Sequence, residues 1–290
     1  MVAGIIAVII NTVLNYLLIF GVGVFPEWGV AGAAIATVTA RFVQVAIVVV
    51  WAHTHTKRVE FVQGLYKTLC VPVQLAKRIV VKGLLPLMTN EFLWSAGVSA
   101  LVQCYSLRGI DVVAGLNISN TVVNLFNVMF IAFGSGVSIV IGQMLGANKL
   151  DEARYAAPRL IMFSGVMCVV IGGVMACLCK VFPLAYNTSD NVRSLASMFI
   201  LISAVLMPVH SILHSTYFTL RSGGKTLITF IFDSGFSWLV SVPLAYCLAH
   251  FTGMNIIWLY LCCQCVEAVK CVVGLWLVKQ GFWLSNIVSE

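Results

Sequence analysis

The sequence is poor in charged residues. Only 9% of its 290 residues are Asp, Glu, Lys or Arg, whereas 61% are hydrophobic and the mean hydropathy is +1.02. A soluble domain carries about a quarter charged residues, so this composition excludes a soluble enzyme. Apolar runs of about 20 residues recur along the whole chain, and runs of that length are typical of membrane-spanning helices. The sequence therefore predicts an all-α polytopic membrane protein.

Several functional signals are also missing. No basic segment precedes the apolar run at residues 1–21, which we interpret as a first span and not as a cleavable signal peptide. The Lys and Arg residues form short clusters between apolar runs, and this distribution argues against a nucleic-acid partner. The segment 221–226 ends like a phosphate-binding loop, but Thr219 stands where that pattern needs glycine. Cysteines 262, 263 and 265 lie inside an apolar run and are interpreted as small apolar side chains.

Eight apolar segments are long enough to span a bilayer. They cover residues 3–22, 29–52, 84–107, 112–145, 158–181, 194–219, 226–250 and 255–279. Residues 60–83 differ, because Lys67, Lys77, Arg78 and Lys82 interrupt the apolar residues there. That segment is interpreted as an amphipathic linker at the membrane surface, between two groups of helices.

The basic residues predict the orientation of these spans, since cytoplasmic loops collect Lys and Arg. Alternate loops are rich in them, and the richest are the linker and the loop after residue 145, with Lys149, Arg154 and Arg159. Eight spans with both termini in the cytoplasm place all of these loops on the cytoplasmic side.

Ionisable residues within spans are costly and are functional candidates by default. Glu91 has no partner in its own helix, and a polar stripe continues from it through Ser95 and Ser99. Asp233 is followed four residues later by Ser237. Glu91 is either a site for a coupling cation or a buried acid hydrogen-bonded to a neighbouring helix. Asp233 is either such a site or an ordinary acid that is solvated near the cytoplasmic end of its span. Glu267 and Lys270 are one turn apart and can neutralise each other as a structural pair.

Four amides share one face of the fourth span, namely Asn117, Asn120, Asn124 and Asn127. Such a row either lines an aqueous cavity or bonds helices together, and four in line favours the cavity. His210 and His214 are four residues apart on one helix. They could sense protons on a cavity wall or simply pack, and no adjacent glutamate supports a metal site.

At these residues the chain resembles the multidrug and toxic compound extrusion (MATE) family over essentially its whole length. Three stretches carry the resemblance: residues 15–37 with Gly29-Val30-Ala31-Gly32, residues 142–148 with sequence GQMLGAN, and residues 220–226 with sequence LRSGGKT. Glu91 falls where family members carry a glutamate in their seventh helix. One departure is His210, which stands about where some branches carry an aspartate that helps to bind the coupling cation.

The resemblance implies a fold of twelve helices in two lobes, of which this chain would hold the last eight. Residues 1–52 would be the last two helices of the N-terminal lobe and residues 53–83 a cytoplasmic linker. Residues 84–281 would form the complete six-helix C-terminal lobe, and residues 282–290 a cytoplasmic tail. The four N-terminal helices are absent, so we expect an N-terminally truncated form with those helices as a candidate partner.

The function implied is that of a secondary antiporter in the cell membrane, not an enzyme. It would export organic cations in exchange for protons or sodium ions, in contact with membrane lipid and without any other cofactor. Glu91 and Asp233 are the candidates for cation coupling, while Ser95, the four asparagines and the two histidines are candidates for the substrate cavity. The alternatives are a flippase for lipid-linked oligosaccharides, which a cavity dense in Arg and Lys would favour, and a non-transporting membrane fragment.

Overall fold

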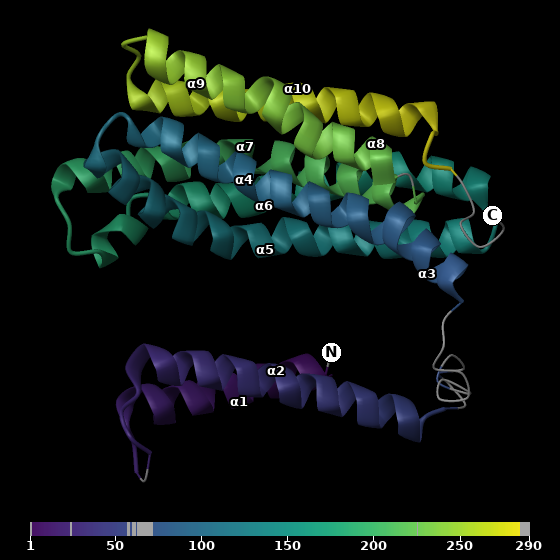
Figure 1. Ribbon diagram of the computed structural model, residues 1–290. Helices are drawn as coiled ribbons and strands as arrows, with labels where there is room; N and C mark the ends of the chain where they lie inside the picture. Colours follow the sequence, from purple (N-terminus) through teal and green to yellow (C-terminus); the bar gives the residue numbers. More distant parts are fainter. Residues whose placement is uncertain are drawn as a thin grey trace. The chain divides into compact units, whose positions relative to one another are not determined.

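The computed structural model describes residues 2–23, 25–56, 59, 62, 72–224 and 226–284, and within these ranges it is helical, without strands (Figure 1). The chain divides into two units, Met1–Ala76 and Lys77–Glu290, and each is considered by itself. Residues 57–58, 60–61 and 63–71 of the predicted linker, including Lys67, and most of the predicted C-terminal tail lie outside the described residues.

The first unit contains a hairpin of two helices, α1 (Val2–Phe20) and α2 (Gly29–Thr54). The backbone N–H of Trp28 donates a hydrogen bond to the carbonyl oxygen of Leu18 at 2.9 Å. A Cβ atom on Gly32 would lie only 2.6 Å from that same oxygen. The glycine therefore allows the backbones of the two helices to approach closely, as small residues do between helices in membranes.

The second unit is a bundle of long helices. Its elements, starting with a short helix on the boundary between the units, are α3 (Val73–Ile79), the π-helical turn η2 (Val80–Leu84), α4 (Leu85–Ser106), α5 (Ile110–Gly146), α6 (Leu150–Leu178), the 3-10 turn η3 (Phe182–Ala185), α7 (Asp190–Ser222), α8 (Thr226–Phe230), the π-helical turns η4 (Ile231–Gly235) and η5 (Ser237–Ser241), α9 (Val242–Phe251) and α10 (Ile256–Gln280). Helix α3 continues through η2 directly into α4, so residues 73–83 of the predicted linker are helical.

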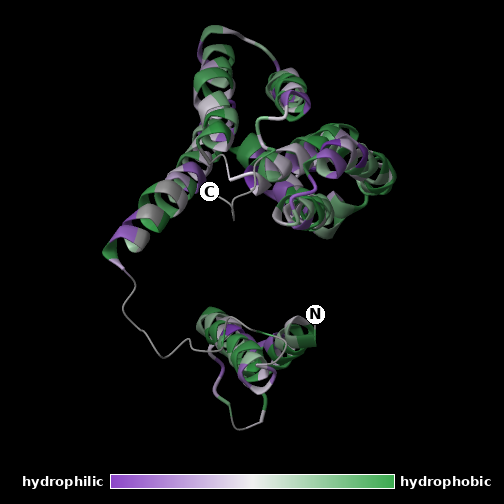
Figure 2. Cartoon of the chain, turned by 90° about the vertical axis from the view of Figure 1, so that its right-hand side faces the viewer, coloured by the Kyte–Doolittle hydropathy of each residue, from purple (hydrophilic) through white to green (hydrophobic). Residues whose placement is uncertain are grey.

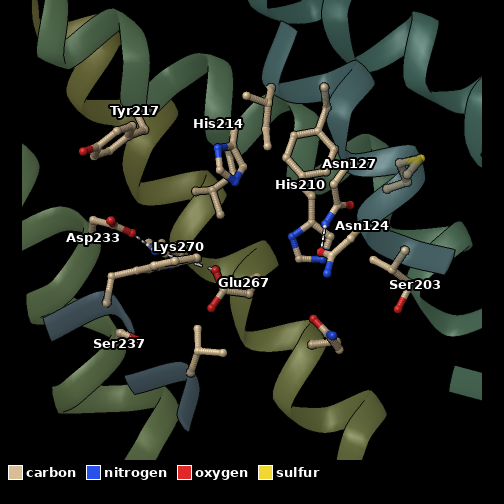
Figure 3. A pocket seen from close by; sticks show the side chains of 18 of the residues that line it. Asn124, Asn127, Ser203, His210, His214, Tyr217, Asp233, Ser237, Glu267 and Lys270 are labelled. Atoms are coloured by element: carbon tan, nitrogen blue, oxygen red, sulfur yellow. Dashed lines mark hydrogen bonds and ion pairs between the residues drawn. The ribbon is translucent and has the colours of Figure 1, made fainter. Parts of the chain in front are cut away.

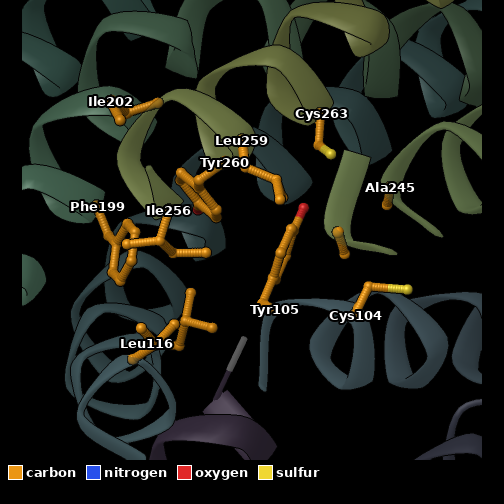
Figure 4. Packing of buried hydrophobic residues seen from close by; sticks show 12 residues of the cluster. Cys104, Tyr105, Leu116, Phe199, Ile202, Ala245, Ile256, Leu259, Tyr260 and Cys263 are labelled. Atoms are coloured by element: carbon orange, nitrogen blue, oxygen red, sulfur yellow. The ribbon is translucent and has the colours of Figure 1, made fainter. Parts of the chain in front are cut away.

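Helix α7 forms the centre of the bundle, with α5, α6 and α10 packed against it. One apolar cluster joins α4, α5, α7, α9 and α10 (Figure 4). Within it the Tyr105 and Tyr260 rings meet edge to face at 5.6 Å, and the Phe199 ring lies 4.8 Å from Tyr260. Aromatic pairs at these separations add to the stabilisation that burial provides.

The outer surface of each unit is apolar. Large side chains such as Phe42, Val170 and Leu239 are exposed, and the helices in Figure 2 are hydrophobic along much of their length. Within the described ranges, seven helices are long and apolar enough to cross a membrane. Helix α4 is the remaining predicted span, with 22 residues that include Asn90 and Glu91. The predicted all-α polytopic membrane fold is confirmed.

Close packing of α6 on α7 gives a test of this bundle. A Cβ on Gly172 would lie 2.5 Å from the carbonyl oxygen of Ala204, whereas nothing lies within 4 Å of a Cβ on Gly173. We expect Gly172→Ala to lower the free energy of unfolding in mixed micelles by about 1–3 kcal/mol, because the two backbones must separate. Gly173→Ala is the matched control and should be neutral or stabilising. Equal effects of the two changes would contradict the described packing.

Candidate functional site

A polar cavity of about 450 Å³ lies inside the second unit. Side chains from α4, α5, α7, the π-helical turns and α10 line it, and Figure 3 shows ten of them with labels. Apolar walls come from residues such as Trp94, Phe130 and Phe232. Its polar and charged lining consists of Glu91, Asn120, Asn124, Asn127, Ser203, His210, His214, Tyr217, Arg221, Asp233, Ser237, Tyr260, Gln264, Glu267 and Lys270.

The strongest interaction in the cavity is an ion pair between two helices. Lys270 Nζ on α10 donates to Asp233 Oδ1 at 2.7 Å and lies 3.8 Å from Glu267 Oε2. The exposed fractions of these side chains are 7% for Lys270, 17% for Asp233 and 20% for Glu267. Lys270 thus forms ion pairs with both carboxylates. Its shorter contact is with Asp233 and not with Glu267, the neighbour on its own helix that the sequence suggested.

Two local features place Asp233 beside α10. Asp233 sits in the π-helical turn η4, and such turns widen a helix and occur frequently at functional sites. On α10, one turn beyond Lys270, a Cβ at Gly274 would lie 2.7 Å from Phe232 Cζ and 2.8 Å from Thr216 Cγ2. The glycine therefore leaves room for the ring that precedes Asp233, and that ring in turn lies 5.6 Å from the Lys270 ammonium.

Asn90 connects this ion pair to α4 and α7. Its Nδ2 donates to Asp233 Oδ2 at 3.2 Å and to the hydroxyl of Tyr217 at 3.4 Å, while Ser234 Oγ donates to Asn90 Oδ1 at 2.7 Å. Asn90 is 3% exposed. Its satisfied amide fixes the orientation of the Asp233 carboxylate. Sequence reasoning singled out neither Asn90 nor Tyr217, because both act through partners more than 120 residues away.

Glu91 lines the cavity from α4, next to Trp94 and Val98 on the same helix. Ser95, the cavity candidate on that helix, is exposed and is not part of the lining. The face of α4 that meets the cavity therefore runs from Glu91 through Trp94, Val98 and Leu101.

Three of the four aligned asparagines line the cavity from α5. These are Asn120, Asn124 and Asn127, and the amide of Asn127 donates to Asn124 Oδ1 at 3.4 Å (Figure 3). Asn117, one turn before Asn120, is exposed and lies outside the lining. The amides of α5 thus give this wall of the cavity hydrogen-bonding groups that carry no formal charge.

Both histidines of α7 line the cavity. The His214 ring packs 4.7 Å from the Phe130 ring, and His210 is close enough to Glu267 and Lys270 for an electrostatic interaction. Across the ranges that the structure describes, no group of three or more His, Cys, Asp or Glu side chains is arranged to hold a metal ion.

Apolar helices around a polar cavity, with an ion-pair network in its wall, are typical of membrane transport proteins. The MatE family model matches residues 86–247, which contain α4 to η5 and most of the cavity. The chain belongs to the MatE family, whose members are multidrug efflux transporters of membranes.

Curated relatives agree with this assignment. The chain is 24% identical over 266 residues to the probable multidrug resistance protein YoeA of Bacillus subtilis. The aligned region covers 87% of this chain and 54% of the relative. It is also 24% identical over 251 residues to the probable multidrug resistance protein NorM of Thermotoga maritima, with coverage of 86% and 52%. The chain thus spans about half the length of the curated relatives it matches.

Solved structures show the same fold. An outward-facing multidrug resistance MATE family transporter of the MOP superfamily superimposes with a TM-score of 0.81 at 17% identity, over 96% of this chain and 61% of that one. The Vibrio cholerae MATE transporter VcmN in its bent form gives a TM-score of 0.78 at 19% identity, with the same coverage. The relationship to the MATE family stated from the sequence is confirmed.

Proposed function

We propose that the cavity in the second unit binds an organic cation and exchanges it for a coupling ion, a proton or a sodium ion, as part of a secondary exporter. The observation that carries this proposal is the charge of the cavity wall, in which Glu91, Asp233 and Glu267 outnumber the cations. A carboxylate in a partly desolvated cavity attracts a cationic substrate and a coupling ion alike. The two therefore compete for the same negative charge, which links the movement of one to that of the other.

Roles follow for the individual side chains. Among the described acids of the lining, Glu91 is the one that makes no ion pair, and it offers its charge directly to a ligand. Asp233, in its ion pair with Lys270, modifies the electrostatic potential at Glu91. The asparagines of α5 and the aromatic walls supply hydrogen bonds and apolar surface, which suit an amphipathic molecule.

A lipid-linked oligosaccharide carries a phosphate group, and a flippase for it would need an excess of cations. The lining holds only two strong cations, Lys270 and Arg221, and Lys270 is already engaged by carboxylates. This balance favours the cation exporter over the flippase.

The proposed function is tested by ligand binding to the purified chain in detergent. Ethidium, a fluorescent organic cation, should bind saturably and be displaced by tetraphenylphosphonium, but not by an anionic dye of similar size. Saturable binding of the anionic dye instead would favour the flippase. Absence of any saturable binding by folded protein would identify a non-transporting membrane fragment.

We further propose that the chain lies in the cell membrane with the loop at Lys149 in the cytoplasm. Lys149, Arg154, Arg159 and Arg221 lie towards one end of the bundle, whereas the opposite loops hold Arg108, Lys180 and Arg193. The membrane potential and insertion machinery retain basic residues on the cytoplasmic side. A cysteine introduced at Lys149 should resist an impermeant thiol reagent in intact cells and react after the cells are opened. Its modification from outside would reverse the proposed orientation.

A further inference from the structure

Lys270 sits where an exchangeable cation would bind. Its ammonium lies 2.7 Å from Asp233 Oδ1 and 3.8 Å from Glu267 Oε2, in the wall of the cavity. The Phe232 ring, at 5.6 Å, adds a further contact that favours a cation at this point. In Figure 3 the Asp233 and Glu267 side chains both point towards the lysine end group. The charge of the two acids is thus already partly neutralised by a cation that belongs to the chain.

The surrounding structure holds this ammonium in place. Lys270 is 5% exposed, and Gly274 on the next turn of α10 lets Phe232 pack closely against that helix. Asn90 and Ser234 fix the carboxylate on the other side of the pair. A tethered group of this kind has a high effective concentration at its binding partner, so a free ion competes poorly with it.

We propose that Lys270 determines the specificity for the coupling ion: its ammonium takes the place of a sodium ion between Asp233 and Glu267 and so excludes sodium from this site. This inference rests on the proposed function. A sodium ion at the same carboxylate oxygens would face an ammonium only a few ångströms away, and two like charges at that separation repel strongly in a partly buried site.

The charged and titratable groups that face the Lys270 ammonium include Asp233 and Glu267 themselves. The others, from α4 and α7, are Glu91, His210, His214, Tyr217 and Arg221, whereas the polar contribution of α5 to the lining is its asparagines.

The test is a gain of sodium binding in Lys270→Met, which removes the ammonium while keeping the length of an unbranched side chain. Thermal unfolding of the purified chain is followed by tryptophan fluorescence in sodium chloride and in choline chloride at equal ionic strength. Wild-type protein should unfold at the same temperature in both salts. Lys270→Met should show a saturable sodium-dependent rise in that temperature, with an apparent sodium affinity at least about tenfold above the upper limit that the absent wild-type response sets.

Three further variants complete this experiment. Lys270→Arg keeps a cation in place and should be insensitive to sodium, and Lys270→Met combined with Asp233→Asn should lose the gained response. Lys149→Met, which removes an exposed lysine paired with Glu152 outside the cavity, is the matched control.

A sodium response in wild type or Lys270→Arg as large as in Lys270→Met would overturn the proposal, as would a folded Lys270→Met protein without any response. Ethidium binding by the wild-type chain is measured in parallel. Its absence would contradict the proposed function, whereas the sodium response of the variants decides the role of Lys270 alone.

Discussion

Asp233→Asn should lower the free energy of unfolding by about 3 kcal/mol, because it leaves the buried Lys270 ammonium without its closest counter-charge. The asparagine keeps the shape of the side chain and can still accept a hydrogen bond from Asn90. The loss of stability therefore measures the missing negative charge and not a packing defect. Glu267 Oε2, at 3.8 Å, still partly neutralises the Lys270 ammonium in this variant. The expected loss of unfolding free energy therefore lies at the low end of the range for broken buried ion pairs.

Equilibrium unfolding in mixed micelles measures this effect. Asp190→Asn is the matched control, since Asp190 also accepts from a basic side chain, that of Arg193, but is almost fully exposed. It should cause no measurable change. Replacing both Asp233 and Lys270, by Asn and Met, should restore much of the lost stability, because no unpaired cation remains. An Asp233→Asn protein as stable as wild type would show that the two groups are not paired in the folded chain.

Glu91→Gln should weaken binding of an organic cation by at least about tenfold, because it removes the one full negative charge of the lining without an ion-pair partner in the described structure. Wild-type affinity should rise with pH, as the protons that compete with the ligand become scarce. The variant should depend less on pH. Glutamine preserves the size and hydrogen bonding of the side chain, so expression and unfolding should change little.

Fluorescence anisotropy of ethidium, titrated at several pH values, measures both effects. Glu152→Gln removes an exposed acid of α6 outside the cavity and is the matched control. It should leave affinity and pH dependence unchanged. If Glu91→Gln bound ethidium with the affinity and pH profile of the wild type, Glu91 would have no part in the mechanism.

The helices were largely predictable from the sequence, because a bilayer demands long apolar segments. The segment predicted at 194–219 is α7, Asp190–Ser222, and that predicted at 255–279 is α10, Ile256–Gln280. A clear difference is at α6, which begins at Leu150 and not at 158. Its first turns carry Asp151, Glu152, Arg154 and Arg159, so the helix extends beyond its apolar part, and hydropathy alone does not detect this extension.

Contacts between helices were less predictable. Glu267 and Lys270 are neighbours on one helix, and their spacing suggested a local pair. The structure brings Asp233, 37 residues away, closer to the lysine than Glu267. This contact depends on the widened turn at η4 and on the space beside Gly274, and helical periodicity encodes neither.

On α4 the sequence did not determine which face of the helix lines the cavity. Residues three and four positions apart share a face, so Glu91 belongs equally to a stripe through Ser95 and to one through Trp94 and Val98. The polar stripe was the one predicted, whereas the described cavity is lined by the other. On α5 the structure places Asn120, Asn124 and Asn127 in the lining of the cavity and Asn117 outside it. Helical spacing alone does not show which members of such a row line a cavity.

Competition between an organic cation and a proton inside the cavity is most directly tested by counting protons as the ligand binds. Ethidium is added to the purified chain in weakly buffered solution with a pH indicator, under conditions where binding is saturated. The account predicts that binding releases protons, and that Glu91→Gln reduces this release. Saturable binding without any proton release would contradict it.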